Sequence, residues 1–248
     1  MTSEWLPFED PPDARLRLVC CAHSGSGVAP FARWRRQLPA GVALCPVRRP
    51  GREGTFGRPL LTSVSAIVAG IAAALAERPL LPTVVLGHSL GACEAYELAR
   101  GLQASGRPPR LLIVSGRHAP EHPLDLRAAD LPDDALVDAI ARRYGGIPDA
   151  VRHEPELLAM MLPILRADLA AAEAWRPAPD PRWRGPTWVV NGDADRAIVP
   201  ARVDDWRRSV DGPITLDWLP GDHFYLFDPA SGFFAALLAR LAALIDHA

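Results

Sequence analysis

Short apolar runs recur along the chain and are separated by stretches with helical spacing. Six of these runs are continuously apolar rather than alternating, and most end in glycine or another turn residue, which is typical of buried strands. The predicted strands cover residues 15–22, 42–47, 83–87, 110–116, 187–192 and 214–219. Helical patterns lie between and after them, at 63–77, 91–104, 201–209 and 230–246. This alternation predicts an α/β fold with a mostly parallel central sheet and helices on both faces.

One long segment, residues 118–182, interrupts the alternation because it contains no good strand pattern. It holds helix-like pieces at 132–144, 154–162 and 163–175, which proline and glycine separate. A connection of about 65 residues is far longer than a usual crossover. We therefore expect a helical lid inserted into a single domain that spans residues 1–248, with an ordinary crossover containing extra turns as the alternative.

Composition and charge narrow the class of protein. Of the 248 residues, 49% are hydrophobic and 23% charged, as in ordinary soluble globular proteins. The net charge of −2 offers no strongly basic face for nucleic acid. The N-terminus lacks a basic start followed by an apolar run, and no stretch of 18 apolar residues occurs. We expect a cytoplasmic protein that neither binds nucleic acid nor enters a membrane.

The four cysteines give no pattern for a metal site, because none of them forms a C-x-x-C pair. Cys20 and Cys21 are adjacent on a predicted strand, so their side chains should point to opposite faces of the sheet. We expect all four to be buried free thiols, and we expect no metal site.

A possible catalytic nucleophile stands at the end of the third predicted strand. Gly87-His88-Ser89-Leu90-Gly91 matches the pattern G-x-S-x-G, with an apolar strand before it and a helical pattern after it. This strand–turn–helix setting is the one that a nucleophile elbow requires. The sharp turn would hold the Ser89 hydroxyl at a helix N-terminus, where partial positive charge favours a developing anion.

A serine hydroxyl needs a base, and the base needs an acid that orients it. In α/β-hydrolases the chain order is serine, acid, histidine. His223 follows the last predicted strand, and Asp193 and Asp195 both follow the strand before it. We prefer Asp195 as the acid, because the longer loop lets its carboxylate turn toward His223, and we keep Asp193 as the alternative. Asp222 should point elsewhere and be structural.

Two backbone N–H groups would be needed to stabilise an oxyanion. One should come from Leu90, directly after the nucleophile. The other should come from the loop after the first predicted strand, where glycines let the backbone approach a ligand, and we expect the amide of Ser24. A phosphate-binding turn is the alternative for this loop, but no lysine follows it.

Taken together, these residues resemble the type II thioesterases, the stand-alone editing enzymes of polyketide synthases and nonribosomal peptide synthetases. The resemblance runs from about Leu16 to Phe234. The common first-loop pattern H-A-G-G is here His23-Ser24-Gly25-Ser26. The matching segments are CAHSGSG (21–27) with Phe31 and Trp34, RRPGRE (48–53), LGHSLGACEAYELA (86–99), SGRHAP (115–120), YGGIP (144–148), PELLAMMLPILRADLAAAEAW (155–175), NGDAD (191–195) and GDHFYL (221–226).

The resemblance implies an α/β-hydrolase fold in which Ser89, Asp195 and His223 form the triad and Ser24 and Leu90 supply the oxyanion amides. It also implies a substrate: an acyl thioester on the phosphopantetheine arm of an acyl or peptidyl carrier protein, hydrolysed without a further cofactor to clear stalled chains. The segment 118–182 would be the lid over the acyl pocket. A general carboxylesterase or lipase, or an acyltransferase, would use the same triad.

Two groups of residues invite a more specific interpretation. Met160, Met161 and Leu162 in the predicted lid are apolar and could line the acyl pocket, although a helix face packed on the core would look the same. Arg48, Arg49 and Arg52 could attract an acidic carrier protein, or could form structural ion pairs.

Overall fold

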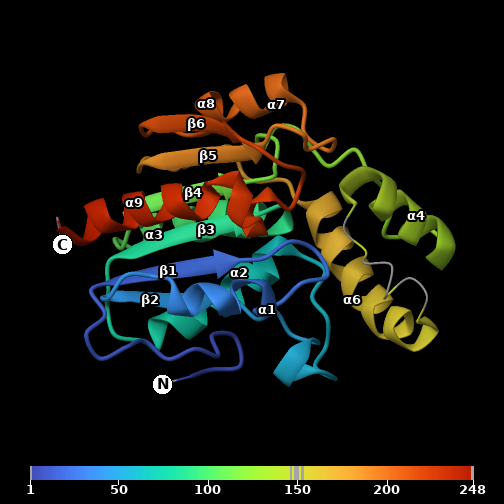
Figure 1. Ribbon diagram of the computed structural model, residues 1–248, viewed down its shortest axis with the longest axis horizontal. Helices are drawn as coiled ribbons and strands as arrows, with labels where there is room; N and C mark the ends of the chain where they lie inside the picture. Colours follow the sequence, from blue (N-terminus) through green and yellow to red (C-terminus); the bar gives the residue numbers. More distant parts are fainter. Residues whose placement is uncertain (1, 146, 148–150, 152–153, 247–248) are drawn as a thin grey trace.

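The computed structural model describes residues 2–145, 147, 151 and 154–246. Its centre is a sheet of six strands, all parallel, in the order β2-β1-β3-β4-β5-β6 (Figure 1). All six predicted strands are present, so the α/β prediction is confirmed. The strands are β1 (Leu16–Cys21), β2 (Val42–Pro46), β3 (Thr83–His88), β4 (Leu111–Ser115), β5 (Thr187–Gly192) and β6 (Ile214–Leu219).

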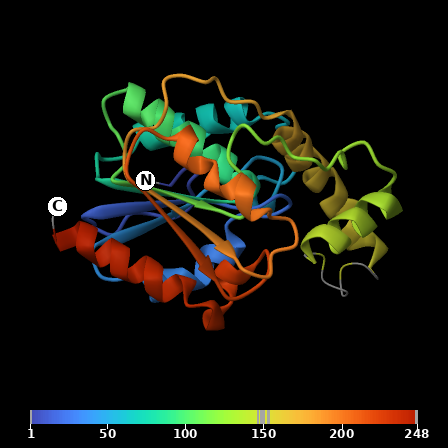
Figure 2. The same cartoon turned by 90° about the horizontal axis from the view of Figure 1, so that it is seen from above.

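Helices cover both faces of the sheet. Figure 2 shows α2, α3 and α7 on one face and α1 and α9 on the other. No described helix is long and apolar enough to cross a membrane. The helices are α1 (Ala29–Ala32), α2 (Val64–Ala76), α3 (Leu90–Ala104), α4 (Asp133–Tyr144), α6 (Pro155–Ala174), α7 (Pro200–Asp204), α8 (Trp206–Ser209) and α9 (Phe233–Asp246), with 3₁₀ turns η1 (Arg33–Arg36), η2 (Glu53–Thr55), η3 (Tyr225–Phe227) and η4 (Pro229–Ser231).

The two faces of the sheet bury separate hydrophobic cores, and the adjacent cysteines of β1 divide between them. Cys20 packs in the core under α9, whereas Cys21 packs in the core under α2 and α3. All four cysteines are buried and free, as predicted. Burial raises the pKa of the Cys45 and Cys93 thiols to about 11.

The segment between β4 and β5 lies beyond the carboxyl ends of the strands. Its helices α4 and α6 project at that end of the sheet (Figures 1 and 2). A third hydrophobic cluster joins them, and it includes Leu136 and Ile140 of α4 and Leu162 and Leu165 of α6. Gly146 and Pro148 of the YGGIP motif lie outside the described residues.

The prediction of two separate helical pieces around Pro163 is wrong, because α6 is a single helix of 20 residues with Pro163 inside it. A proline in a helix leaves the carbonyl four residues earlier without its hydrogen bond. Pro163 and Ala159 are both exposed, so water can satisfy the Ala159 carbonyl and the helix continues.

Candidate active site

The predicted nucleophile lies at a tight bend between β3 and α3. Ser89 has φ 58° and ψ −115°, a combination that non-glycine residues rarely adopt. A Cβ at Gly87 would lie 1.9 Å from the Gly91 oxygen, and a Cβ at Gly91 would lie 2.1 Å from the Cys21 oxygen. Both positions must therefore be glycine, because the strand, the helix and β1 approach one another this closely.

The predicted base and acid are in contact. His223 follows β6, Asp195 follows the adjacent strand β5, and Nδ1 of the imidazole lies 2.6 Å from Asp195 Oδ2. Both side chains are buried, and the Ala197 N–H donates to Asp195 Oδ1 at 2.9 Å, which fixes the carboxylate. The alternative acid, Asp193, is exposed and accepts from the Gly221 N–H at 3.0 Å.

Asp222 is also turned away from the imidazole, as predicted. Its carboxylate accepts from the N–H of Phe224 at 2.8 Å and closes a local turn. The loop after β6 therefore presents only its histidine to the Asp195 carboxylate.

A cavity of about 160 Å³ joins these residues under the helices of the 118–182 segment. Ser24, Ser89, Leu90 and His223 all line it, so the structure brings these four predicted residues together. Asp195 contacts His223 from behind. The rest of the wall is mainly apolar and includes Leu124, Ile140, Met161, Leu165, Leu169 and Ala172.

Of the three apolar residues expected at the acyl pocket, only Met161 lines this cavity. Met160 is 50% exposed, because it lies on the opposite side of α6. Leu162 is buried, but it packs in the cluster between α4 and α6. The prediction that Met160 and Leu162 line the acyl pocket is therefore wrong: Met160 lies on the surface of α6, and Leu162 packs between α6 and α4.

The loop after β1 carries the amides expected to face an oxyanion. The Gly25 N–H donates to Asp168 Oδ2 at 2.8 Å, and the Ser26 N–H donates to the His23 oxygen at 3.3 Å. These bonds occupy the Gly25 and Ser26 amides, and Ser24 lines the cavity with Ser89, so the Ser24 amide stays the predicted donor of this loop. Leu90 is the first residue of α3, so its N–H has no partner inside the helix.

A buried cluster of charges holds this loop in place. Arg52 forms a two-point hydrogen bond with Asp168 of α6, at 2.7 and 2.9 Å. Arg49 pairs with Glu94 of α3 at 3.1 Å and donates to the backbone oxygens of Ala22, His23 and Ser26. The cluster thus connects α6, the loop after β1 and α3, the helix that begins directly after Ser89.

The idea that these arginines attract a carrier protein is wrong for Arg49 and Arg52, whose side chains are almost inaccessible. Their structural alternative holds, because a buried charge requires a partner. Arg48 is half-buried and donates to the Glu4 carbonyl at 2.8 Å.

Two further imidazoles, His23 and His88, lie near His223 and are held neutral by burial. Burial lowers the pKa of His23 to about 3 and the pKa of His88 well below its ordinary value. The His88 ring lies 4.8 Å from the His223 ring, and its Nδ1 is 2.9 Å from Ser115 Oγ. Because both rings are uncharged near neutral pH, neither places a positive charge beside His223.

A family model described as "Thioesterase domain" matches residues 16–242. The chain belongs to the thioesterase family. The thioesterase is 36% identical over 226 residues to "Thioesterase PikA5" of Streptomyces venezuelae, which covers 89% of this chain and 79% of that protein. It is 32% identical over 217 residues to "Gramicidin S biosynthesis protein GrsT" of Aneurinibacillus migulanus, which covers 87% of this chain and 84% of that protein.

A solved structure is similar over its whole length. The "type II thioesterase BorB from the borrelidin biosynthetic cluster" matches with a TM-score of 0.87 and 30% identity, and the match covers 99% of each chain. The predicted α/β-hydrolase fold and the resemblance to type II thioesterases are confirmed. The thioesterase is a hydrolase that acts on thioesters.

Sequence reasoning missed two residues of the thioesterase site. Asp168 looked like an ordinary polar position of a lid helix, and nothing in the local pattern showed that it is buried. Arg117 also lines the cavity. It had a usable signal, because it follows Gly116 at the carboxyl end of a buried strand, the same position that marked Ser89, Asp195 and His223.

Proposed function

We propose that this thioesterase hydrolyses acyl groups from the phosphopantetheine arm of carrier proteins, and so removes stalled or aberrant chains during polyketide or nonribosomal peptide synthesis. The relatives support this setting, since one is named for gramicidin S biosynthesis and another comes from a borrelidin cluster. The observation that carries the proposal is the 2.6 Å contact between Asp195 and His223, whose ring lines the same cavity as Ser89.

In the first step, the Ser89 oxygen attacks the thioester carbonyl while His223 Nε2 removes the hydroxyl proton. Asp195 accepts a hydrogen bond from Nδ1, which fixes the tautomer and stabilises the imidazolium. The amides of Ser24 and Leu90 and the N-terminus of α3 stabilise the oxyanion. The carbon–sulfur bond then breaks, and the departing sulfur takes the proton from His223.

In the second step, a water molecule gives a proton to His223 and attacks the acyl-serine ester. The Ser89 oxygen leaves with that proton, and the free carboxylic acid departs. The chain's own groups and water handle every proton and electron pair. The proposal therefore requires no cofactor beyond the arm that presents the substrate, and it places the enzyme in the cytoplasm with its carrier proteins.

The sharpest test compares two aspartates of one loop. Asp195→Asn should lower kcat/KM for an acyl-pantetheine thioester by roughly 10³- to 10⁴-fold, because the imidazole loses its orienting charge. Asp193→Asn serves as the matched control and should stay within about threefold, since it removes only a surface charge and its amide oxygen can still accept from the Gly221 N–H. Ser89→Ala should abolish turnover while the thermal unfolding curve keeps its shape. Retained turnover in Ser89→Ala would refute the mechanism.

Substrate comparison separates the alternatives that share the triad. Acyl-loaded carrier proteins and acyl-pantetheines should be hydrolysed faster than p-nitrophenyl esters of the same acids. Faster hydrolysis of the oxygen esters would favour a general carboxylesterase or lipase. Transfer of the acyl group to an added alcohol or amine, in preference to water, would favour an acyltransferase.

A further inference from the structure

Arg117 places a positive charge in the wall of the cavity without an acceptor to match it. Arg117 as a whole residue is only 5% exposed to solvent. The Nε and Nη2 atoms of its guanidinium have no hydrogen-bond partner among the described residues. It is also the one permanently charged side chain among the described residues that line the cavity with Ser89.

The other buried arginines near the site show what Arg117 lacks. Arg49 and Arg52 each face a carboxylate of the buried cluster. The Arg117 guanidinium makes a cation–π contact with the Trp175 ring, 5.6 Å from its centroid, but this contact supplies no oxygen acceptor for its N–H groups. An unpaired buried charge costs several kcal/mol, so its retention indicates a partner that arrives with the substrate.

The backbone of Arg117 is fixed beside the reacting groups. A Cβ at the preceding Gly116 would lie 3.1 Å from His223 Cε1. The Arg117 carbonyl accepts from the indole N–H of Trp206 at 3.1 Å, which anchors the residue from the other side. Arg117 therefore enters the cavity that Ser89 and His223 line from a backbone position next to the imidazole. The phosphate of a pantetheine arm is many bonds from the thioester, so a group on the acyl chain is the nearer candidate partner.

We infer that Arg117 binds a hydrogen-bond-accepting oxygen on the acyl chain, close to the thioester carbonyl. This inference rests on the proposed function. A planar guanidinium matches a carboxylate with two parallel hydrogen bonds, and it binds a keto or hydroxyl oxygen with one. The preferred substrates thus belong to the oxygenated acyl thioesters, with a 3-carboxylate, 3-oxo or 3-hydroxyl group as the three sources of that oxygen.

The test measures kcat/KM on pantetheine thioesters of butyrate, 3-hydroxybutyrate, 3-oxobutyrate and malonate, for the wild type and for Arg117→Met. The readout is the ratio of each oxygenated substrate to butyrate. Comparing this ratio between the two proteins cancels the intrinsic reactivity of each thioester. Arg117→Met should lower the ratio by about 10-fold or more for the substrate that carries the natural acceptor. Arg107→Met removes an exposed arginine near the amino ends of the strands, at the other end of the sheet from the cavity. It should leave all ratios unchanged.

The result that overturns the inference is a loss in Arg117→Met that is equal for all four substrates, or no loss on any of them. Thermal unfolding gives a second readout, because removal of an unpaired buried charge should not lower the midpoint. If Arg117→Met does not fold, Arg117→Lys allows the same comparison, since an ammonium keeps the charge but not the two-point geometry. A wild-type enzyme inactive on all four thioesters would instead contradict the proposed function.

Discussion

Ser89 has a positive φ, a backbone conformation that is sterically unfavourable for a residue with a side chain. Its N–H donates to the Ser115 oxygen at 2.8 Å, and the first turn of α3 begins at the next residue. The glycines on either side leave no room for a Cβ, so the bend cannot relax sideways. Strain of this kind costs about 1–3 kcal/mol and persists where the surroundings fix it. The consequence is a hydroxyl that is oriented before a substrate arrives.

His118 gives the folded protein a defined sensitivity to acid. Its Nε2 accepts a hydrogen bond from the Val199 N–H at 2.8 Å, which only the unprotonated nitrogen can do. Burial, followed by the charges of Arg117 and Arg202, lowers its pKa to about 4. The unfolded chain therefore binds this proton more readily, and His118 lowers stability as the pH falls from about 6.5 toward 4.

We expect His118→Gln to flatten this part of the stability profile, because a glutamine oxygen can accept from Val199 without titrating. Between pH 7 and pH 5, the wild type should lose about 2 kcal/mol more unfolding free energy than the variant. Urea unfolding at the two pH values measures the difference. Equal losses in both proteins would mean that His118 does not titrate in this range.

The positions of site residues that directly follow strands could be predicted from the sequence. The burial of charged residues within helices could not. Ser89 and Asp195 follow the buried strands β3 and β5. His223 follows β6, where the prediction of a buried strand is wrong, because this edge strand is only partly covered and carries Asp217. The three residues still come together, as the topology and the expected chain order predicted. Asp168 and Glu94 lie in helices, where a carboxylate ordinarily indicates a solvent-facing side. Their burial depends on Arg49 and Arg52, which are distant in the sequence, and no local pattern reveals such a pairing.

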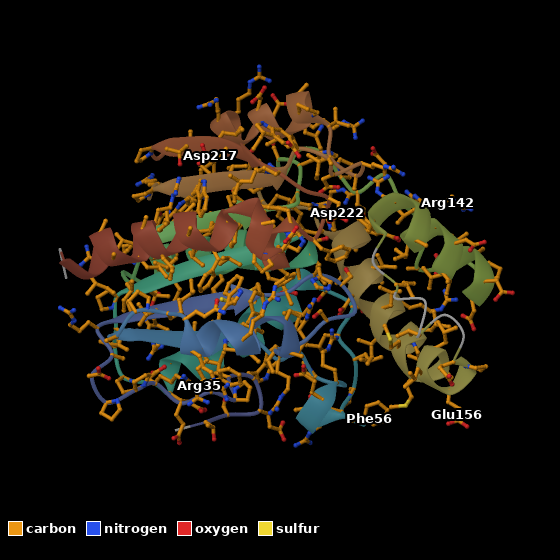
Figure 3. All side chains as sticks on the ribbon, in the orientation of Figure 1. Arg35, Phe56, Arg142, Glu156, Asp217 and Asp222 are labelled. Atoms are coloured by element: carbon orange, nitrogen blue, oxygen red, sulfur yellow. The ribbon has the colours of Figure 1, made fainter. Side chains whose placement is uncertain are left out.

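The two halves of helix α6 differ in how far their side chains are exposed to solvent. Its first turns carry exposed apolar side chains, with Leu157 46% and Met160 50% exposed (Figure 3 labels the adjacent Glu156). Its second half is buried, with Asp168 in the ion cluster and Ala171 in the main core. The periodic pattern predicted helix on both sides of Pro163, but the proline signal wrongly divided it. Continuity depends on solvent reaching the Ala159 carbonyl, which is a property of the fold.

At the scale of this helix, Asp168 should be a major source of stability. Asp168→Asn removes the charge that faces Arg52 and is expected to cost about 3 kcal/mol, since it leaves a buried guanidinium poorly matched. Asp133→Asn at the start of α4 is the matched control, because that carboxylate pairs with Arg166 at the surface and should contribute less than about 1 kcal/mol. Urea unfolding compares the two, and similar losses would contradict the assignment.

Over the whole molecule, the parallel sheet assembles a site from residues that are far apart in the sequence. Five of the six strands are each followed by a loop that supplies one side chain or amide of the site. Helix α6 covers the space above these loops. A sequence pattern could predict the strands and this common edge. It could not predict how closely α4 and α6 pack over this end of the sheet, because the cavity volume depends on side chains from both helices and from several loops. The groups are Ser24 after β1, Ser89 after β3, Arg117 after β4, Asp195 after β5 and His223 after β6.

The cavity volume sets an expectation for chain length. A methylene group fills about the volume of a water molecule, about 30 Å³, so 160 Å³ holds roughly five such groups. We expect kcat/KM on an unbranched acyl-pantetheine series to fall at least about fivefold between hexanoyl and decanoyl. Leu169→Ala, which enlarges the cavity, should move the optimum to longer chains. Leu157→Ala, at the exposed end of α6, should not move it, and a shift there would argue against this cavity as the acyl site.

The burial of the cysteines has a practical consequence for measuring this enzyme. Thioester hydrolysis releases one pantetheine thiol per turnover, and aromatic disulfide reagents detect such thiols by colour. All four protein thiols are shielded from solvent, and their raised pKa values leave little thiolate to react. The folded enzyme thus contributes almost no background, and continuous absorbance can follow product formation without mutating a single cysteine.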